Sequence, residues 1–452
     1  MAESSHAVSL SHVSQDTEVA LSRPCAAPRF RVRWKIFLFT FAFLLIAYIQ
    51  QKGPTVAGYY MMPDLGLTQM QLGWLETAFL IGYTVLQFPS CVIGQRIGAR
   101  RLFTCAGVIS IAAVLVTPLA PFLLHGATLF AVLVAAQLLL GASQPPIPAV
   151  STGLYEPWFP PARWSLVNGL QAMCLGLGIA VTAPLISGLM LSVGWQLALL
   201  STLLPALIIV PWWAWYGRNT PMEHPSVTAG ELAELGPPRS PGEYRISWPR
   251  LQAVLKNRDV QLLTFSYLSS NYTFYLIGNW CFLYLVQERH FSALEGGWLA
   301  AAPPICASLG AGIGGYYGGV LVRRYGTRTG LRIIPLTSLP LAGVLLLLAV
   351  GATNPYVAVA MLAGCFACNQ LNEGPYWAAL MHVAGADTMS AGGVLNTGGN
   401  AGGLIAIPIV AYLSGHHAWT GAFIIGAVFA FAAGAAWLLI DPTRRLRAAP
   451  AS

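Results

Sequence analysis

The chain has 452 residues, of which 56% are hydrophobic and only 9% are charged. This composition leaves too little polar surface to cover a water-soluble globule of this length, so it excludes that class and predicts a membrane protein. The formal net charge of +8 does not indicate a nucleic-acid partner, because the basic residues are scattered over several separate segments.

Twelve apolar segments follow one another along the chain, each long enough to cross a hydrocarbon core of about 30 Å. The first six are predicted at 36–60, 72–93, 102–124, 127–154, 166–191 and 195–216. The second six are predicted at 260–285, 294–321, 333–350, 356–381, 389–413 and 419–440. We therefore expect an all-α membrane protein with twelve transmembrane helices in two six-helix pseudo-repeats.

Basic residues mark every second connection between these segments. All but two of the 24 Lys and Arg residues lie on one side of the series, and Lys52 and Arg289 are the two left over. Lys and Arg concentrate in cytoplasmic loops, so both termini are predicted to be cytoplasmic, with the protein in the cell inner (plasma) membrane.

The chain is predicted to divide into two bundles joined by a linker, because a polar, proline-rich stretch separates six spans from six spans. We expect a disordered cytoplasmic tail over 1–33, an N-terminal bundle over 34–216, a cytoplasmic linker over 217–258, a C-terminal bundle over 259–440 and a cytoplasmic tail over 441–452. The first 30 or so residues lack the apolar core of a signal peptide.

The two bundles repeat one design. The sequence 96–100 after the second span is echoed by 324–328 after the eighth, about half the chain later. A second echo is independent: Pro and Trp bracket a turn at 184–195 and again, with the same spacing, at 408–419. Parallel repeats are typical of transporters that rock two bundles about a site near the bilayer midplane.

The loop after the second span resembles a known motif. Residues 86–89 leading into 95–101 are similar to the loop between helices two and three of the major facilitator superfamily, and the segments 64–67, 78–83, 158–163 and 396–408 resemble its anion:cation symporter branch. The resemblance implies secondary transport by alternating access. It also implies that a gating loop is formed by Arg96, Gly98, Arg100 and Arg101.

The chain departs from that family at charged positions. The motif's usual Gly and Asp are replaced by Cys91 and Gln95, which removes a carboxylate that in the family helps to close the inside face. The branch's Asp and Arg in the first helix correspond to Gln50 and Gln51, and its Glu in the fourth helix to Gln144. In the branch the Arg is associated with a substrate carboxylate and the two acids with proton coupling, so the resemblance does not carry these roles over.

Two charged residues within predicted spans, Glu373 and Lys52, are singled out as functional candidates, because a charge at mid-bilayer costs about 2.5 to 3.5 kcal/mol. Glu373 lies midway along the tenth span and is interpreted as a proton or cation coupling site, with a permanently paired or protonated packing residue as the alternative. Lys52 precedes Gly53-Pro54, which is predicted to interrupt the first helix. Lys52 could bind an anion, pair with Glu373, or extend to the outer interface.

Polar side chains recur at helical spacing within the spans. One predicted stripe holds Asn369, Asn372, Glu373 and Tyr376, and another holds Asn271, Tyr272, Tyr275 and Asn279. The candidate substrate-binding residues are Tyr48, Gln51, Lys52, Tyr83, Gln87, Gln144, Gln171, Asn271, Tyr272, Tyr275, Asn279, Asn369, Asn372, Trp377, Asn396 and Asn400. The alternative for each polar residue is hydrogen bonding between helices.

No enzyme, metal or cofactor site is expected. The G-x-G-x-x-G spacing at 310–315 and the C-x-x-C spacing at 365–368 both lie inside predicted spans with no preceding strand, so close helix packing is the better interpretation. His416 and His417 are expected in a solvated outer turn.

We thus predict a monomeric secondary transporter of a small polar solute, an organic anion (carboxylate) first, with protons as candidate coupling ion. The alternatives are a facilitator or exchanger of a neutral polyol or sugar-like solute, and a membrane sensor built on a transporter frame.

Overall fold

The computed structural model describes residues 31–235, 244 and 246–446, and this part of the chain is helical with no strand. Most of the predicted tail 1–33 lies outside the described residues, and the first helix already begins at Val32. Eight helical stretches are long and apolar enough to cross a membrane, and two of them, of 57 and 61 residues, are long enough to do so twice.

The N-terminal bundle is formed by seven α-helices. They are α2 (Val32–Leu65), α3 (Gln69–Ile97), α4 (Ala99–Leu119), α5 (Gly126–Ser143), α6 (Pro146–Trp158), α7 (Trp164–Ser201) and α8 (Leu203–Tyr216). Two short 3-10 helices, η1 (Ala120–Phe122) and η2 (Pro161–Arg163), lie in its turns.

The linker carries η3 (Pro221–Glu223) and two helices, α9 (Ala229–Ala233) and α10 (Trp248–Lys256). The C-terminal bundle follows directly. Its elements are α11 (Arg258–Gln287), α12 (Ala293–Leu299), α13 (Ala302–Gly351), α14 (Pro355–Gln370), α15 (Glu373–Ala384), η5 (Gly385–Asp387), α16 (Thr388–Gly415) and α17 (Trp419–Ala436).

The helices do not match spans one to one, because some contain a bend and others a break. Within α7 and α13, Gly194 and Gly326 have positive φ angles of 81° and 78° and divide each into two passes. Conversely, α5 with α6, the segment of α7 after Gly194 with α8, α12 with the first part of α13, and α14 with α15 each form one pass. In the described residues this gives the twelve passes predicted from the sequence. Gly98 and Gly326, the centres of the repeated loop, share the positive-φ, extended-ψ geometry that an L side chain disfavours.

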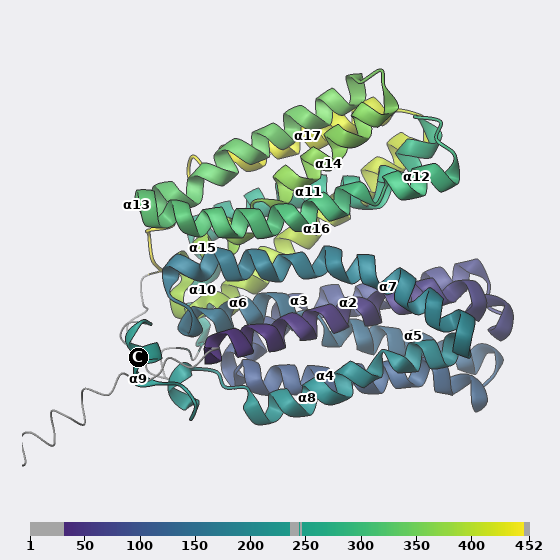
Figure 1. Ribbon diagram of the computed structural model, residues 1–452, viewed down its shortest axis with the longest axis horizontal. Helices are drawn as coiled ribbons and strands as arrows, with labels where there is room; N and C mark the ends of the chain where they lie inside the picture. The colour runs from purple at the N-terminus through teal and green to yellow at the C-terminus, as the bar shows by residue number, and fades with distance from the viewer. Residues whose placement is uncertain (1–30, 236–243, 245, 447–452) are drawn as a thin grey trace, which may run out of the picture.

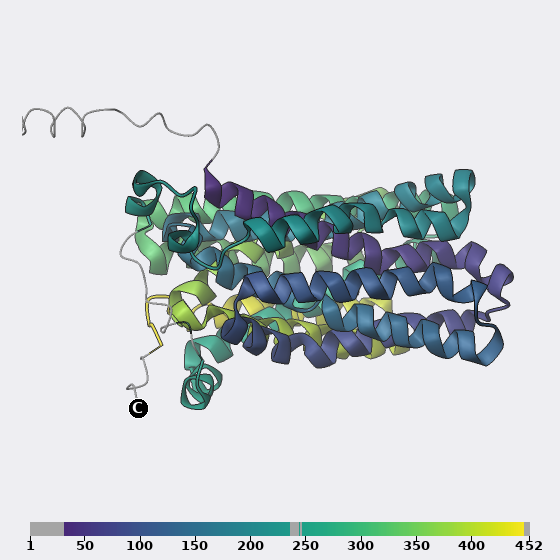
Figure 2. The same ribbon diagram turned by 90° about the horizontal axis from the view of Figure 1, so that it is seen from below.

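The two bundles lie side by side, with the linker helices α9 and α10 at one end, which we call the linker end (Figures 1 and 2). In Figure 1 the bundles are closest at the linker end and diverge toward the other end. Between the bundles, α7 packs on α13 and α15, and α16 packs on α3 and α6.

Glycines allow the closest helix approaches. A Cβ atom at Gly310 would lie 2.5 Å from the Ala367 carbonyl oxygen, and one at Gly315 would lie 2.8 Å from that of Ser165. Small residues let helix backbones pack closely in membranes. The G-x-G-x-x-G spacing therefore serves helix packing, as the sequence predicted.

Candidate functional site

The centre of the candidate site is a helix break in the C-terminal bundle. Helix α14 ends at Gln370 and α15 begins at Glu373, so the carboxyl group sits at the first turn of a half-helix, where the helix dipole favours negative charge. The Glu373 Oε2 atom accepts hydrogen bonds from the Tyr267 hydroxyl at 3.2 Å and from the Trp377 indole nitrogen at 3.1 Å. Glu373 remains partly exposed.

The break changes one sequence prediction, because three of the four residues in the predicted stripe face one helix and the fourth faces another. Asn369 donates to Ser270, Glu373 accepts from Tyr267, and Tyr376 bonds with Ser266, all on α11. Asn372, at the break, instead exchanges hydrogen bonds with Ser338 on α13. Asn369 and Asn372 thus bond within the C-terminal bundle.

A hydrogen-bond network crosses between the bundles. The Tyr275 hydroxyl on α11 donates to Asn400 Oδ1 at 3.2 Å, and the Asn400 amide donates to Gln87 Oε1 on α3 at 3.4 Å. Gln87 Nε2 in turn donates to the Pro145 carbonyl at 3.3 Å, at the break between α5 and α6. We call Gln87, Tyr275 and Asn400 the inter-bundle network. It is the chain's clearest candidate for a polar surface that moves when the bundles move.

Tyr83 and Tyr48 extend this polar surface on the N-terminal side. Tyr83 lies beside Asn396 of the other bundle. Tyr48 packs against Gly178, and it lies close enough to Tyr83, Tyr275 and Glu373 to interact with them electrostatically. The structure therefore brings together predicted residues from α2, α3, α11, α15 and α16.

Lys52 and Gln51 follow Tyr48 along α2. Helix α2 continues from Val32 through Pro54 to Leu65, so the predicted interruption at Gly53-Pro54 is wrong: the missing proline N–H removes one hydrogen bond without ending the helix. Lys52 lies four residues after Tyr48, on the same helix face. It is exposed and forms no ion pair among the described residues, so it is not paired with Glu373 here.

Other predicted residues lie outside this central surface. Tyr272 is buried and stacks on Phe429, with ring centroids 4.3 Å apart, and so does not share the stripe of Tyr275. Asn279 is exposed. Asn271 stays on the face of Tyr267 and Tyr275, beside Gly399 of α16, but its amide donates to the Tyr267 carbonyl of its own helix. Each consecutive residue turns about 100° around a helix, which separates Tyr272 from its neighbours.

Two predicted glutamines bond or pack within the N-terminal bundle. The Gln171 amide donates to the Pro148 carbonyl of α6 at 3.0 Å. Gln144 lies at the break between α5 and α6 and lines a cavity enclosed by N-terminal helices. Among the described residues, neither side chain forms a hydrogen bond with the C-terminal bundle.

The predicted gating loop binds mainly within its own bundle. Gly98 adopts its positive φ beside Asn219, whose side chain would meet a Cβ atom there at 2.5 Å. The Arg100 side chain donates to the Ala214 carbonyl of α8 at 2.9 Å, whereas Arg96 and Arg101 are exposed. These contacts fix the turn between α3 and α4.

Gln95 makes the cross-bundle contact at the linker end. Its Nε2 atom donates to Asp387 Oδ1 at 2.7 Å, and its Oε1 atom accepts the backbone N–H of Ser390 at 3.0 Å. Arg250 of α10 donates to the other Asp387 oxygen at 3.0 Å. We call Gln95, Arg250, Asp387 and Ser390 the linker-end cluster. Cys91, which stands where the family motif usually has Gly, also faces the other bundle. It lies against Gly393 of α16, which has no side chain to clash with it.

Sequence reasoning missed two parts of this arrangement. Tyr267 was not singled out, although it precedes Asn271 by four residues and so extends the same helix face. Asp387, Ser390 and Arg250 carried no sequence signal, because their contacts join residues from 137 to 295 positions apart in the chain. No group of His, Cys, Asp and Glu side chains in the described residues is placed to bind a metal ion.

Known proteins share both sequence and fold with this chain. Residues 36–392 match the Major Facilitator Superfamily. The chain is 26% identical over 404 residues to the hexuronate transporter of Bacillus subtilis, covering 87% of this chain and 92% of that protein. It is 27% identical over 377 residues to a probable sulfoacetate transporter of Cupriavidus necator, covering 81% and 84%.

The solved structure of the proton:xylose symporter XylE superposes with a TM-score of 0.73 at 13% identity, covering 91% of this chain and 96% of that one. The fold is therefore shared even where the sequences have diverged. The resemblance drawn from the sequence motifs is confirmed, and the two named relatives fit its anion:cation symporter branch. The chain belongs to the major facilitator superfamily and is a multi-pass membrane transporter, not an enzyme.

Proposed function

We propose that this transporter carries a small organic anion, a carboxylate, by alternating access, with a proton on Glu373 as the coupling ion. The observation that carries the proposal is the position of Glu373. It lies at a helix break, is held by Tyr267 and Trp377, and faces the Tyr48 side of the other bundle. An ionisable residue at such depth is a functional hypothesis by default.

Charge balance links the anion to the proton. A carboxylate solute and an ionised Glu373 repel each other. On the face of α2 that carries Tyr48, Lys52 is the one Lys or Arg side chain without an ion pair among the described residues. Protonation of Glu373 removes that repulsion, so the anion and the proton bind together. The named hexuronate and sulfoacetate relatives support an acidic solute.

A neutral polyol or sugar-like solute is the second candidate. The inter-bundle network consists of amides and a hydroxyl, which suit neutral hydroxyl groups, and Gln51 stands where the anion:cation branch has an arginine. A transporter of this kind would need neither Lys52 nor a charge on Glu373.

We further propose that the linker end faces the cytoplasm in the inner (plasma) membrane. The basic residues support this orientation, since Arg96, Arg101 and Lys256 are exposed at that end. The bundles are then in contact on the cytoplasmic side and diverge toward the outside (Figure 1).

The test is uptake by the purified protein in proteoliposomes. Hexuronates and other small carboxylates are compared with their neutral sugar or polyol analogues, with and without an imposed proton gradient. The proposal predicts carboxylate uptake that is concentrative only when the outside is acidic. Uptake of the neutral analogues alone would replace it with the second candidate, and carboxylate uptake unaffected by the gradient would remove Glu373 as coupling site.

A further inference from the structure

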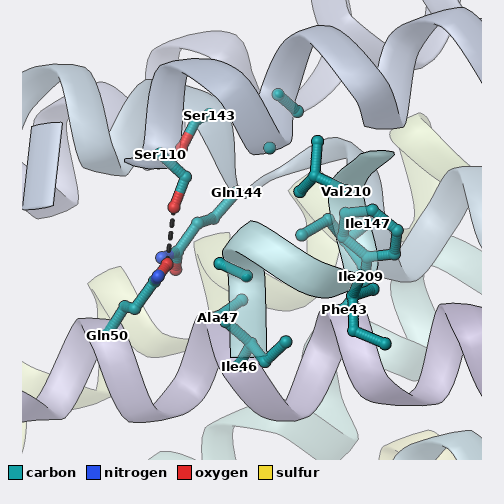
Figure 3. Close-up of a pocket in the computed structure, with 13 residues that line it drawn as sticks. Phe43, Ile46, Ala47, Gln50, Ser110, Ser143, Gln144, Ile147, Ile209 and Val210 are labelled. Atoms are coloured by element: carbon teal, nitrogen blue, oxygen red, sulfur yellow. Dashed lines mark hydrogen bonds between the residues drawn. The ribbon is translucent and has the colours of Figure 1, made fainter. Parts of the chain in front are cut away.

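A polar cavity lies inside the N-terminal bundle, apart from the surface between the bundles (Figure 3). Its walls come from α2, α4, the α5–α6 break and α8, and most of its lining is apolar. The cavity measures about 20 Å³ as the space open to the centre of a water molecule. About 10 to 15 Å³ is enough to hold a water, provided that polar partners are present.

Four polar side chains gather at one side of this cavity. Gln50 and Gln144 are only 3% and 5% exposed, and neither Nε2 atom has a hydrogen-bond partner in the described protein. The Ser110 hydroxyl donates to Gln50 Oε1, and the Ser143 hydroxyl donates to the Leu140 carbonyl, which leaves both serine oxygens able to accept. Figure 3 shows the amide ends of Gln50 and Gln144 turned toward each other.

Two buried donors without partners are energetically costly. Each unsatisfied buried group destabilises the fold, and nearly all such groups in folded proteins find a partner. The usual partner in a polar cavity is an ordered water that makes about three hydrogen bonds.

We propose that this cavity is a binding site for one structural water molecule, held between Gln50 and Gln144. The water oxygen accepts from both Nε2 atoms, and its hydrogens are donated to the oxygens of Ser110 and Ser143. Two donors and two acceptors match the hydrogen-bonding capacity of water.

The same set of groups disfavours an ion. A small cation requires several oxygens and gains most from a carboxylate, but the side chains here are two amides and two hydroxyls. An anion would meet the serine lone pairs in addition to the amide donors. The site therefore joins α2 to the break between α5 and α6 without any net charge.

The experiment is a double-substitution cycle on the full-length protein, read as Tm in detergent. Gln50→Met and Gln144→Met keep the side-chain volume but remove the amide, alone and together, and Ser110→Ala measures the separate loss of the Ser110–Gln50 hydrogen bond. Gln144→Met is the cleaner substitution, because the Gln144 Nε2 atom has no hydrogen-bond partner in the described part of the chain, whereas Gln50 also accepts from Ser110.

If one water bridges the two amides, Gln144→Met lowers the Tm of the unaltered protein by several degrees. The same substitution lowers the Tm of the Gln50→Met variant much less. If Gln144→Met leaves the Tm unchanged or raises it, the cavity is dry and the proposal is wrong, because removing an unpaired donor from a dry site is favourable. If a variant cannot be purified, a high-resolution map of the unaltered protein decides: a density peak within hydrogen-bonding distance of both amides supports the water, and a featureless cavity overturns it.

Discussion

The fourth and tenth passes are both broken near their middle, but the two breaks differ in charge and in surroundings. The break between α5 and α6 carries Gln144, which lines a cavity within its own bundle. The break between α14 and α15 carries Glu373, which is partly exposed and faces the tyrosines between the bundles. The repeat has thus kept the backbone break in both halves and a carboxyl group in only one.

This difference separates two tasks that a broken helix can perform. In the N-terminal bundle the glutamines Gln87 and Gln171 donate to the carbonyls of Pro145 and Pro148 at the start of α6, which fixes neighbouring helices to the break. In the C-terminal bundle the break instead places an ionisable group at a half-helix N-terminus. Discontinuous helices near the midplane commonly form the solute and ion sites of transporters. We infer that coupling belongs to the C-terminal half and structural support to the N-terminal half.

Glu373→Gln removes the charge difference between the breaks, and we expect the largest effect from it. Accumulation against a gradient should be abolished, because the neutral amide cannot take up and release a proton, whereas exchange of solute across proteoliposomes should persist. Counterflow and gradient-driven uptake measure the two activities separately. Glu76→Gln, at an exposed position of α3, is the matched control and should leave both activities intact. Concentrative uptake by Glu373→Gln at the rate of the unaltered protein would contradict the assignment.

Gln144→Glu tests the comparison from the opposite side by placing a carboxyl group in the neutral break. The cavity is enclosed and offers no cation among its lining residues, so the ionised form should destabilise the protein by about 2.5 to 3.5 kcal/mol. The cost applies to the charged form, so the loss of Tm should grow as the pH rises and shrink at low pH. Equal Tm values for the variant and the unaltered protein across pH 5 to 8 would show that the N-terminal break tolerates a charge as well as the C-terminal break does.

Gln95→Asp should weaken the linker-end cluster. The shorter carboxylate would face Asp387, which now accepts the Gln95 amide at 2.7 Å, and two such charges about 4 Å apart repel by about 1 kcal/mol even in water. We expect faster labelling of single cysteines placed at the linker end, because the bundles separate there more often. Adding Asp387→Asn should restore the slow labelling, and failure of that rescue would mean that the cluster does not hold the bundles together.

The overall architecture could be predicted from the sequence because its signals are local and repeated. Span length, the alternation of basic loops and the repeated loop around Gly98 and Gly326 each depend on a few neighbouring residues, and the twelve passes and family they indicated are confirmed. The continuous first helix was mispredicted because packing stabilises α2 in spite of Pro54, a tertiary effect that local propensity does not include.

The candidate site was only partly predictable. Residues such as Tyr48, Tyr83, Gln87 and Asn400 could be found because polar side chains are rare within membrane spans. Their partners could not be found, since Gln95 with Asp387 is a contact between chain positions that only the packed bundles bring together. Of the stripe predicted around Glu373, Asn369, Glu373 and Tyr376 contact α11, whereas Asn372 at the helix break turns to Ser338 of α13.

Lys52→Gln should produce the smallest effect and the sharpest distinction between an acidic and a neutral solute. Lys52 and Tyr48 share one face of α2, whereas Gln50 turns the other way to accept the Ser110 hydrogen bond, so we propose Lys52 as the positive charge that an anionic solute would meet on α2. A unit charge about 4 Å from a carboxylate contributes about 1 kcal/mol in water, so the KM for an anion should rise about fivefold. Lys256→Gln, exposed on α10, is the matched control. An unchanged KM for the anion in Lys52→Gln would place its carboxylate elsewhere, and an equal rise for a neutral analogue would show that Lys52 acts on the shape of the site instead of on its charge.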